Sequence, residues 1–177
     1  MFRASFSDAS PPFMRPIVSA AAVCLLLALA SAATTGAADG RANAPVDTTA
    51  SEQALLAEVN RVRAARGLPA LRTDGRLVRA ARSHTQIMLR RNRFAHGNVG
   101  ARLRRFGIRG GRVGENLAWG AGSLASAQAI VRMWLESPTH RANLLRPGFR
   151  KIGLGTGFGA FAGYDSAIVV TANFQGS

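Results

Sequence analysis

The segments Ile152–Phe158 (IGLGTGF) and Ala167–Phe174 (AIVVTANF) lie near the end of a chain of 177 residues. Both are predicted strands, and Gly159–Tyr164 joins them as a hairpin. Three glycines alternate along the first strand and so share one of its faces: Gly153, Gly155 and Gly157. A nucleotide-binding glycine loop would be followed by a helix. Because a hairpin follows instead, we expect this glycine face to pack closely against a helix.

Helical patterns precede these strands. Thr49 and Glu52 form a capping box, and an apolar face follows over 55–62. A second helix is predicted over 74–91, a third over 123–136, and a short one over 139–145 after Pro138. A short extended segment, Gly114–Trp119, lies between the second and third helices. Helices in the first half and middle with strands at the end predict an α+β domain.

The first third of the chain differs in composition from the rest. Arg15 precedes an apolar run over 17–33 that ends in small residues, which is typical of a secretory signal peptide. A membrane anchor is the alternative, but the run is short for a bilayer span. We therefore predict a signal peptide over 1–33, a flexible linker over 34–50 and one domain over 51–177. Cys24, the only cysteine, lies in the leader, so the mature chain would have no disulfide.

The chain is strongly basic, with 23 Lys and Arg against 9 Asp and Glu and a net charge of +14. Such a charge favours anionic partners, here a cell-envelope polymer or lipid. The composition bias of a GC-rich genome would produce the same excess of arginine. Few aromatic residues and the predicted export both disfavour nucleic acid. We expect a monomer that is secreted or held in the cell envelope, which means the periplasm in a Gram-negative cell.

The three histidines differ in their surroundings. His84 lies on the apolar face of the second predicted helix, which indicates a structural role. His96 lies in a loop, and His140 opens the short helix after Pro138. With Glu115, these two would form a set of ligands that suits zinc with an open coordination position. The spacings of 19 and 25 residues match no local metal motif, and a salt bridge of Glu115 with an arginine is the default alternative.

Other catalytic templates are absent from the sequence. It has no H-E-x-x-H metalloprotease motif, no G-x-S-x-G elbow and no P-loop. The composition would allow a Ser-His-Asp triad, but no motif indicates one. The catalytic candidates are His96, Glu115 and His140, and we expect no organic cofactor.

An ordered series of short motifs resembles the bacterial CAP domains, relatives of cysteine-rich secretory proteins, insect venom antigen five and plant pathogenesis-related type-one proteins. The match covers residues 52–174. It is carried by Asn60-x-x-Arg63, Gly67-Leu68-Pro69, Phe94-Ala95-His96, Gly114-Glu115-Asn116-Leu117-Ala118, Trp134, Ser137-Pro138-Thr139-His140-Arg141-Ala142-Asn143-Leu144-Leu145 and Ile152-Gly153-Leu154-Gly155. Within these motifs, we expect Asn116 and Asn143 to hold loops and helix ends through hydrogen bonds.

This resemblance implies a three-layer α-β-α sandwich with a small antiparallel sheet. It also implies a cleft lined by His96, His140 and Glu115 that binds a divalent metal in some members, zinc being the expected ion. A second glutamate of eukaryotic members falls at Ser137 here, and Glu136 is expected at an exposed helix end. The family shares no single activity. We favour a binding module for lipid or an anionic envelope component; the alternative is a metal-dependent hydrolase.

Overall fold

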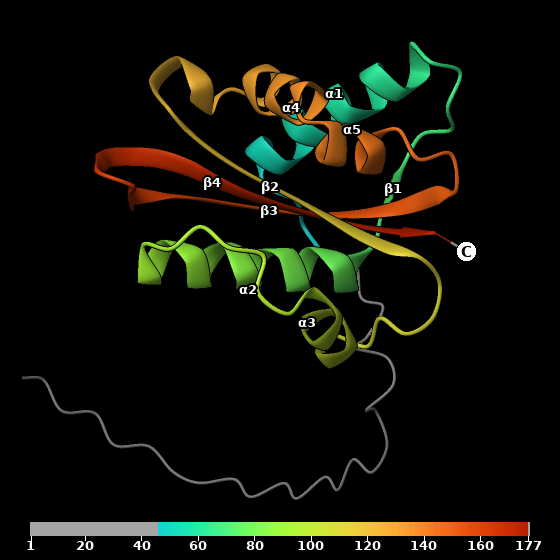
Figure 1. Cartoon of the computed structure of the whole chain (residues 1–177), viewed down its shortest axis with the longest axis horizontal. Helices are drawn as coiled ribbons and strands as arrows, with labels where there is room; N and C mark the ends of the chain where they lie inside the picture. Colours follow the sequence, from blue (N-terminus) through green and yellow to red (C-terminus); the bar gives the residue numbers. More distant parts are fainter. Residues whose placement is uncertain (1–45, 177) are drawn as a thin grey trace, which may run out of the picture. The chain divides into compact units, whose positions relative to one another are not determined.

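The computed structural model describes residues 46–176 (Figure 1). The predicted signal peptide and most of the predicted linker lie outside the described residues. Within 46–176, none of the helices combines the length and the apolar character that a bilayer crossing requires.

The chain forms three layers, with helices on both faces of a four-stranded sheet (Figure 1). One helical layer contains α1 (Ala50–Ala64), α4 (Ala127–Glu136) and α5 (Pro138–Leu144), and the other contains α2 (Gly75–Arg91) and α3 (Val99–Arg105). A short 3-10 helix, η2 (Gly122–Ala125), precedes α4. The strands are β1 (Arg72–Thr73), β2 (Val113–Ala121), β3 (Phe149–Phe161) and β4 (Tyr164–Gly176). This arrangement confirms the predicted α+β class.

The sheet has the order β1-β3-β4-β2. The β3–β4 hairpin forms its centre, and β2 pairs antiparallel with β4, so β2 is an edge strand. The two-residue strand β1 pairs parallel with β3, Arg72 opposite Lys151. The expected small antiparallel sheet is thus formed by β2, β3 and β4, and β1 adds a short parallel edge that makes the whole sheet mixed. Nothing in the sequence marks a two-residue strand, because its side chains are both exposed.

The predicted starts of two helices are confirmed. At α1 the Glu52 amide donates to Thr49 Oγ1 (3.2 Å), and the Thr49 amide donates to Glu52 Oε2 (2.9 Å), which completes the capping box. At α2 the carboxylate of Asp74 accepts from the amides of Arg76 and Leu77. The third predicted helix begins later than expected, at Ala127, because Ser126 caps it there and residues 122–125 form the 3-10 turn.

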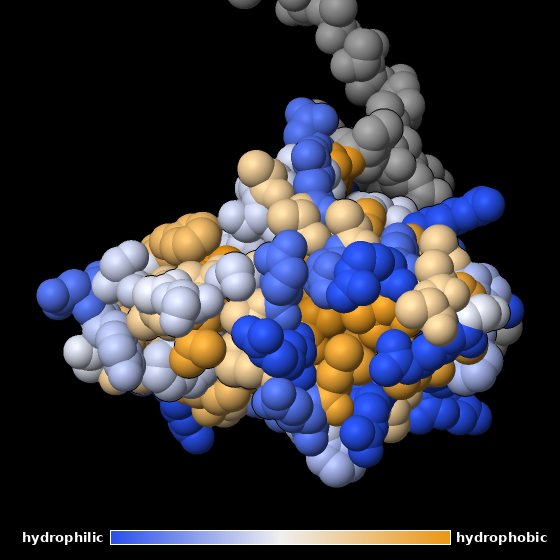
Figure 2. All heavy atoms as spheres, turned by 90° about the horizontal axis from the view of Figure 1, so that it is seen from above, coloured by the Kyte–Doolittle hydropathy of each residue, from blue (hydrophilic) through white to orange (hydrophobic). Residues whose placement is uncertain are grey.

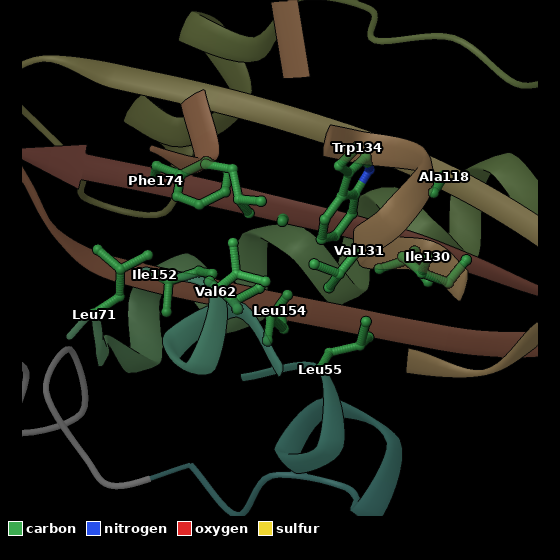
Figure 3. Packing of buried hydrophobic residues seen from close by; sticks show 14 of the residues in the cluster. Leu55, Val62, Leu71, Ala118, Ile130, Val131, Trp134, Ile152, Leu154 and Phe174 are labelled. Carbon is green, nitrogen blue, oxygen red and sulfur yellow. The ribbon is translucent and has the colours of Figure 1, made fainter. Parts of the chain in front are cut away.

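The main core lies between the sheet and the layer of α1, α4 and α5 (Figure 3). Leu55 and Val62 of α1, Ile130 and Trp134 of α4, and Leu154 of β3 are among its fully or almost fully buried members. The Trp134 indole also donates to the carbonyl of Leu117 in β2 at 2.9 Å, which ties α4 to the edge strand.

The opposite face of the sheet packs against α2 through the glycines of β3. A Cβ atom on Gly153 would lie within 3.0 Å of the backbone of Leu77 and Val78, and one on Gly155 would meet the backbone of Ala81 and Arg82. The predicted close approach of a helix to this strand face is confirmed.

The outer side of the α1–α4–α5 layer carries an apolar area bordered by hydrophilic residues (Figure 2). Partly buried apolar side chains of this layer pack on the main core; they include Leu56, Met133, Leu135 and Leu145. A pocket of about 330 Å³ lies between α1 and α4, with Leu55, Ile130 and Ile168 among its lining residues. This layer is close to electrically neutral, since its three helices contain four arginines and three glutamates.

Candidate functional site

The three residues singled out in the sequence come together at the free edge of β2. His96 lies in the loop before α3, Glu115 lies in β2, and His140 lies in α5 on the other side of the sheet. His96 Nδ1 and Glu115 Oε1 are 2.8 Å apart, and the ring centroids of His96 and His140 are 6.4 Å apart. Helices from both layers therefore meet at this edge, because no further strand of the described residues covers it.

Both carboxylate oxygens of Glu115 are engaged by neighbouring side chains. His96 donates through Nδ1 to Oε1, and Arg102 of α3 forms a short ion pair with Oε2. The amide of Asn173, oriented so that both its ends are satisfied, also donates to Oε2 at 3.1 Å. Only 2 % of the Glu115 side chain is exposed, so these partners compensate a charge that would otherwise be costly to bury.

Arg102 is the site residue that sequence reasoning did not name. A salt bridge of Glu115 with an arginine was the default alternative, and the structure confirms it. The identity of the arginine could not be chosen from the sequence, because eleven arginines lie within residues 75–112. Arg102 also donates to the carbonyl of His96 at 3.0 Å, so one guanidinium fixes both the glutamate and the histidine loop.

Two asparagines hold α5 against β2, as the sequence predicted. Asn116 donates to the carbonyl of His140 at 2.9 Å. Asn143 donates to the carbonyl of Glu115 and to Asn116 Oδ1, at 3.2 and 3.0 Å. These bonds fix the backbone that carries His140 relative to the backbone that carries Glu115.

His84 is a buried structural residue, as predicted, and it supports the site from α2. Its Nε2 lies 3.0 Å from the carbonyl of Ala95 and donates to it, so it anchors the chain directly before His96. Burial is the main cause that lowers the pKa of His84, and the nearby charge of Arg102 lowers it further. The neutral imidazole is therefore the form favoured in the folded protein.

The two site histidines differ in solvent access. Half of the His96 side chain is exposed, whereas His140 is partly buried in α5. Burial lowers the pKa of His140, and repulsion by His96 adds to this effect. A neutral imidazole at His140 can accept a hydrogen bond or coordinate a metal ion.

The carboxylate of Glu115 is not available as a metal ligand, because His96 and Arg102 engage both of its oxygens. Within residues 46–176 there is no group of three or more His, Cys, Asp or Glu placed to hold a metal. Glu115 orients His96 by accepting from Nδ1, so Nε2 is the ring nitrogen that this bond does not use, and the ring centroids of His96 and His140 lie 6.4 Å apart. This is the arrangement in which a carboxylate fixes the orientation of a ligating histidine from outside the coordination shell.

Glu136 ends α4 with an exposed side chain, as expected. Ser137 links α4 to α5, and Pro138 occupies the first turn of α5, where its missing amide proton is not needed. This junction turns the chain so that His140 faces the β2 edge.

The layers and the site at the β2 edge define a CAP-type domain. The family model described as the cysteine-rich secretory protein family matches residues 56–174, and the chain belongs to this family. Among solved structures, an extracellular protein with an SCP domain from Bacillus anthracis is similar, with 30 % identity and a TM-score of 0.60 over 72 % of this chain and 40 % of that one. An outer surface protein from Borrelia burgdorferi has the same fold, with 21 % identity, a TM-score of 0.59, and coverage of 75 % of this chain and 97 % of that one.

Two curated relatives come from Bacillus subtilis, and both are described as uncharacterised. YkwD is 33 % identical over 118 residues, which are 64 % of this chain and 45 % of the relative. The membrane protein YlbC is 30 % identical over 112 residues, which are 60 % of this chain and 32 % of the relative. The match thus spans less than half the length of either relative.

Proposed function

We propose that this CAP domain is an exported binding module for an anionic component of the cell envelope. The observation that carries the proposal is the distribution of charge between the two helical layers. Residues 75–112, which form α2, α3 and the loops around them, contain eleven arginines and no aspartate or glutamate. The helices α1, α4 and α5 together are almost neutral, so most of the excess positive charge of the described residues lies in the segment 75–112, on the α2–α3 side of the sheet.

Seven of these eleven arginines are exposed, and we call them the arginine surface: Arg90, Arg91, Arg93, Arg104, Arg105, Arg109 and Arg112. Among the described residues, none of the seven forms an ion pair with a carboxylate, whereas Arg76, Arg82 and Arg102 do. Exposed cations that are not neutralised within the fold attract polyanions and steer their approach. The bidentate geometry of guanidinium suits phosphate and carboxylate groups.

The proposal predicts that retention on isolated bacterial cell walls falls steeply with salt. Between about 0.1 M and 1 M salt the Debye length shrinks from about 10 Å to about 3 Å, which screens exposed charges. The variant Arg91→Ser/Arg104→Ser/Arg105→Ser should elute at clearly lower salt than the unmodified chain, with an affinity at least about tenfold lower. Elution profiles over a salt gradient measure both effects.

The matched control removes three exposed arginines from other parts of the fold, in Arg72→Ser/Arg132→Ser/Arg141→Ser. Both variants lose the same net charge, so a difference between them reports position rather than total charge. If both variants lose the same affinity for cell walls, the binding is a non-specific attraction that depends only on net charge, and the proposal is wrong. Retention that does not change with salt would also disprove the proposal.

A metal-dependent hydrolase is the second candidate, and the closeness of His96 and His140 favours it. Their two imidazoles would hold a divalent ion such as zinc, and Glu115 would orient His96. A bound ion would supply a polarised water for hydrolysis. Glu115 is poorly placed to act as the base, because Arg102 and His96 already occupy both of its oxygens. For this reason we rank binding ahead of hydrolysis.

A zinc titration by calorimetry, combined with an assay of ester hydrolysis, tests the second candidate. If the histidines hold zinc, His96→Ala and His140→Ala should each abolish binding, and each should abolish any zinc-dependent ester hydrolysis, without loss of the folded state. Thr139→Ala serves as the control, because Thr139 is an exposed residue of α5 directly beside His140. Turnover that persists in either alanine variant would exclude a mechanism that depends on a zinc ion held by His96 and His140.

A further inference from the structure

Aromatic side chains gather at one end of the sheet, where the sequence predicts no functional site. Trp119 contacts Phe161 and Tyr164 with ring centroids 5.8 and 5.7 Å apart, and Phe94 meets Phe161 edge to face at 6.4 Å. With Phe158 we call these residues the aromatic end. Three of the five are large exposed side chains: Phe94 (44 %), Tyr164 (53 %) and Phe158 (60 %).

The aromatic end is built around the β3–β4 turn. In Figure 1 this turn, η2 and the C-terminal end of α2 lie at the same end of the molecule. The amide of Ala162 in the turn donates to Asn92 Oδ1, directly after α2, at 2.8 Å. This bond fixes the turn against the end of α2, so the exposed rings are held on a defined support.

Apolar side chains lie on both faces of the hairpin near this turn. Gly157 and Gly159 face α2, because Cβ atoms there would contact Leu89. Phe158 lies between them in the strand, so its side chain points to the opposite face. Phe161 lies on the α2 side, where it packs with Met88, Leu117 and Val169. Phe161 itself is buried, but Tyr164, its partner across the hairpin, and Phe94, which packs on its ring, are exposed. Exposed aromatic rings therefore lie on both faces of the hairpin near the turn.

The arginine surface adjoins this end. Arg90 and Arg91 occupy the last turn of α2, and Arg93 immediately precedes Phe94. Asp165 beside Tyr164 is the only acidic residue of the hairpin. Exposed aromatic rings next to guanidinium groups suit the surface of a lipid bilayer. Aromatic rings insert at the level of the headgroups, and the cations bind the lipid phosphates.

We propose that the aromatic end inserts into the interfacial region of an anionic lipid bilayer, with Arg90, Arg91 and Arg93 on the lipid phosphates. This inference rests on the proposed function for the arginines and goes beyond it by naming the partner and the apolar contact. A bilayer is favoured over a polysaccharide because the rings project from both faces of a hairpin tip. A fluid apolar phase can surround such a tip, whereas a sugar chain would need one flat or concave aromatic platform.

Tryptophan fluorescence tests the insertion directly. The chain contains two tryptophans, and Trp134 is fully buried in the core, so Trp119 is the one that can report on lipid. With vesicles of equal parts phosphatidylglycerol and phosphatidylcholine, Trp119 emission should shift to the blue, and brominated lipid should quench it. Trp119→Phe should remove most of this signal.

Substitution of the exposed rings provides the second measurement. Phe158→Ser/Tyr164→Ser should lower the vesicle partition coefficient about tenfold or more, while salt-dependent retention on an anionic dextran resin stays unchanged. Val113→Ser is the control, since Val113 is also an exposed apolar residue (39 %) but lies at the opposite end of β2. All variants are compared in the same full-length chain, so any contribution of residues 1–45 is common to them.

The outcomes separate this inference from the proposed function. Retention on the dextran resin with no Trp119 shift and no quenching would overturn the insertion and leave the arginine surface as the binding site. Loss of peptidoglycan binding in Phe158→Ser/Tyr164→Ser, with vesicle partition unaffected, would overturn it in favour of a carbohydrate partner. A loss of resin retention in Arg90→Ser/Arg91→Ser/Arg93→Ser with no change in Trp119 quenching would remove these arginines from the bilayer contact.

Discussion

Replacing Gly155 by alanine should lower the free energy of unfolding by about 3 kcal/mol. A single added methyl group would meet the backbone of Ala81 and Arg82 in α2 closer than the 3.0 Å that real Cβ atoms respect. Backbone cannot rotate away as a side chain can, so α2 as a whole must move off β3. Chemical denaturation of the two proteins would give the difference directly.

Gly159→Ala is the matched control, because Gly159 lies on the same face of the same strand. A Cβ atom there would meet only Leu89 Cδ2, at an ordinary 3.7 Å. We expect this variant to change stability by less than about 1 kcal/mol. Similar losses in both variants would mean that glycine matters for strand conformation, and the close contact of α2 with β3 would not be the cause.

The alternation of Gly153, Gly155 and Gly157 made this contact predictable, since three missing side chains on one face indicate that another element comes close. The identity of that element was not predictable. The apolar stripe of α2 made it a candidate for this contact, but other predicted helices have apolar stripes as well. The extent of the hairpin was also underestimated, because β3 continues to Phe161 through a bulge that carries no alternating pattern.

The residues of the candidate site could be predicted from the sequence, but the contacts between them could not. His96, Glu115 and His140 stood out because a loop histidine, a strand carboxylate and a histidine at a helix start are unexplained by core packing. Their meeting at the β2 edge depends on the strand order and on α3. The sequence did not indicate a helix at α3, because arginines dominate this segment and its one buried apolar residue is Leu103.

The uneven distribution of charge along the chain can be read from the sequence, but only the fold shows on which face of the domain the charges lie. The run 75–112 contains no carboxylate, and such a segment could wrap around the whole domain. The sheet instead keeps α2 and α3 together on one side. The net charge of +14 is therefore not spread evenly over the domain, because most arginines of the described residues lie on one side of the sheet. A binding module needs such a localised charged surface to attract its partner to one place.

Arg63 is the second position where we expect a large loss of stability. Its side chain is completely buried, and it donates to four backbone carbonyls rather than to a carboxylate. Nε bonds to Pro69, Nη1 to Leu144 and Arg146, and Nη2 to Phe149, at 2.8 to 3.3 Å. Burial lowers the pKa of Arg63, and the nearby charge of Arg150 adds to this, so the carbonyl oxygens are what stabilise the charge.

Arg63→Met should lower the free energy of unfolding by about 4 kcal/mol, because it leaves several buried carbonyls without a donor. Arg63→Lys should recover only part of this loss, since an ammonium group cannot reach all four acceptors in the fork geometry of guanidinium. Arg66→Met is the control, one turn later and exposed, and should cost less than about 0.5 kcal/mol. Urea denaturation of the three variants measures these differences.

The loss at Arg63 should also reach the functional site. Three of the four carbonyls that Arg63 holds belong to the end of α5 and to the segment that leads into β3, so they help to determine where α5 lies. In Arg63→Lys, which should remain folded at low temperature, we expect the His140 ring resonances to broaden or shift while those of His84 stay unchanged. Unchanged His140 resonances in a destabilised Arg63→Lys variant would show that Asn116 and Asn143 alone position α5 at the edge of β2.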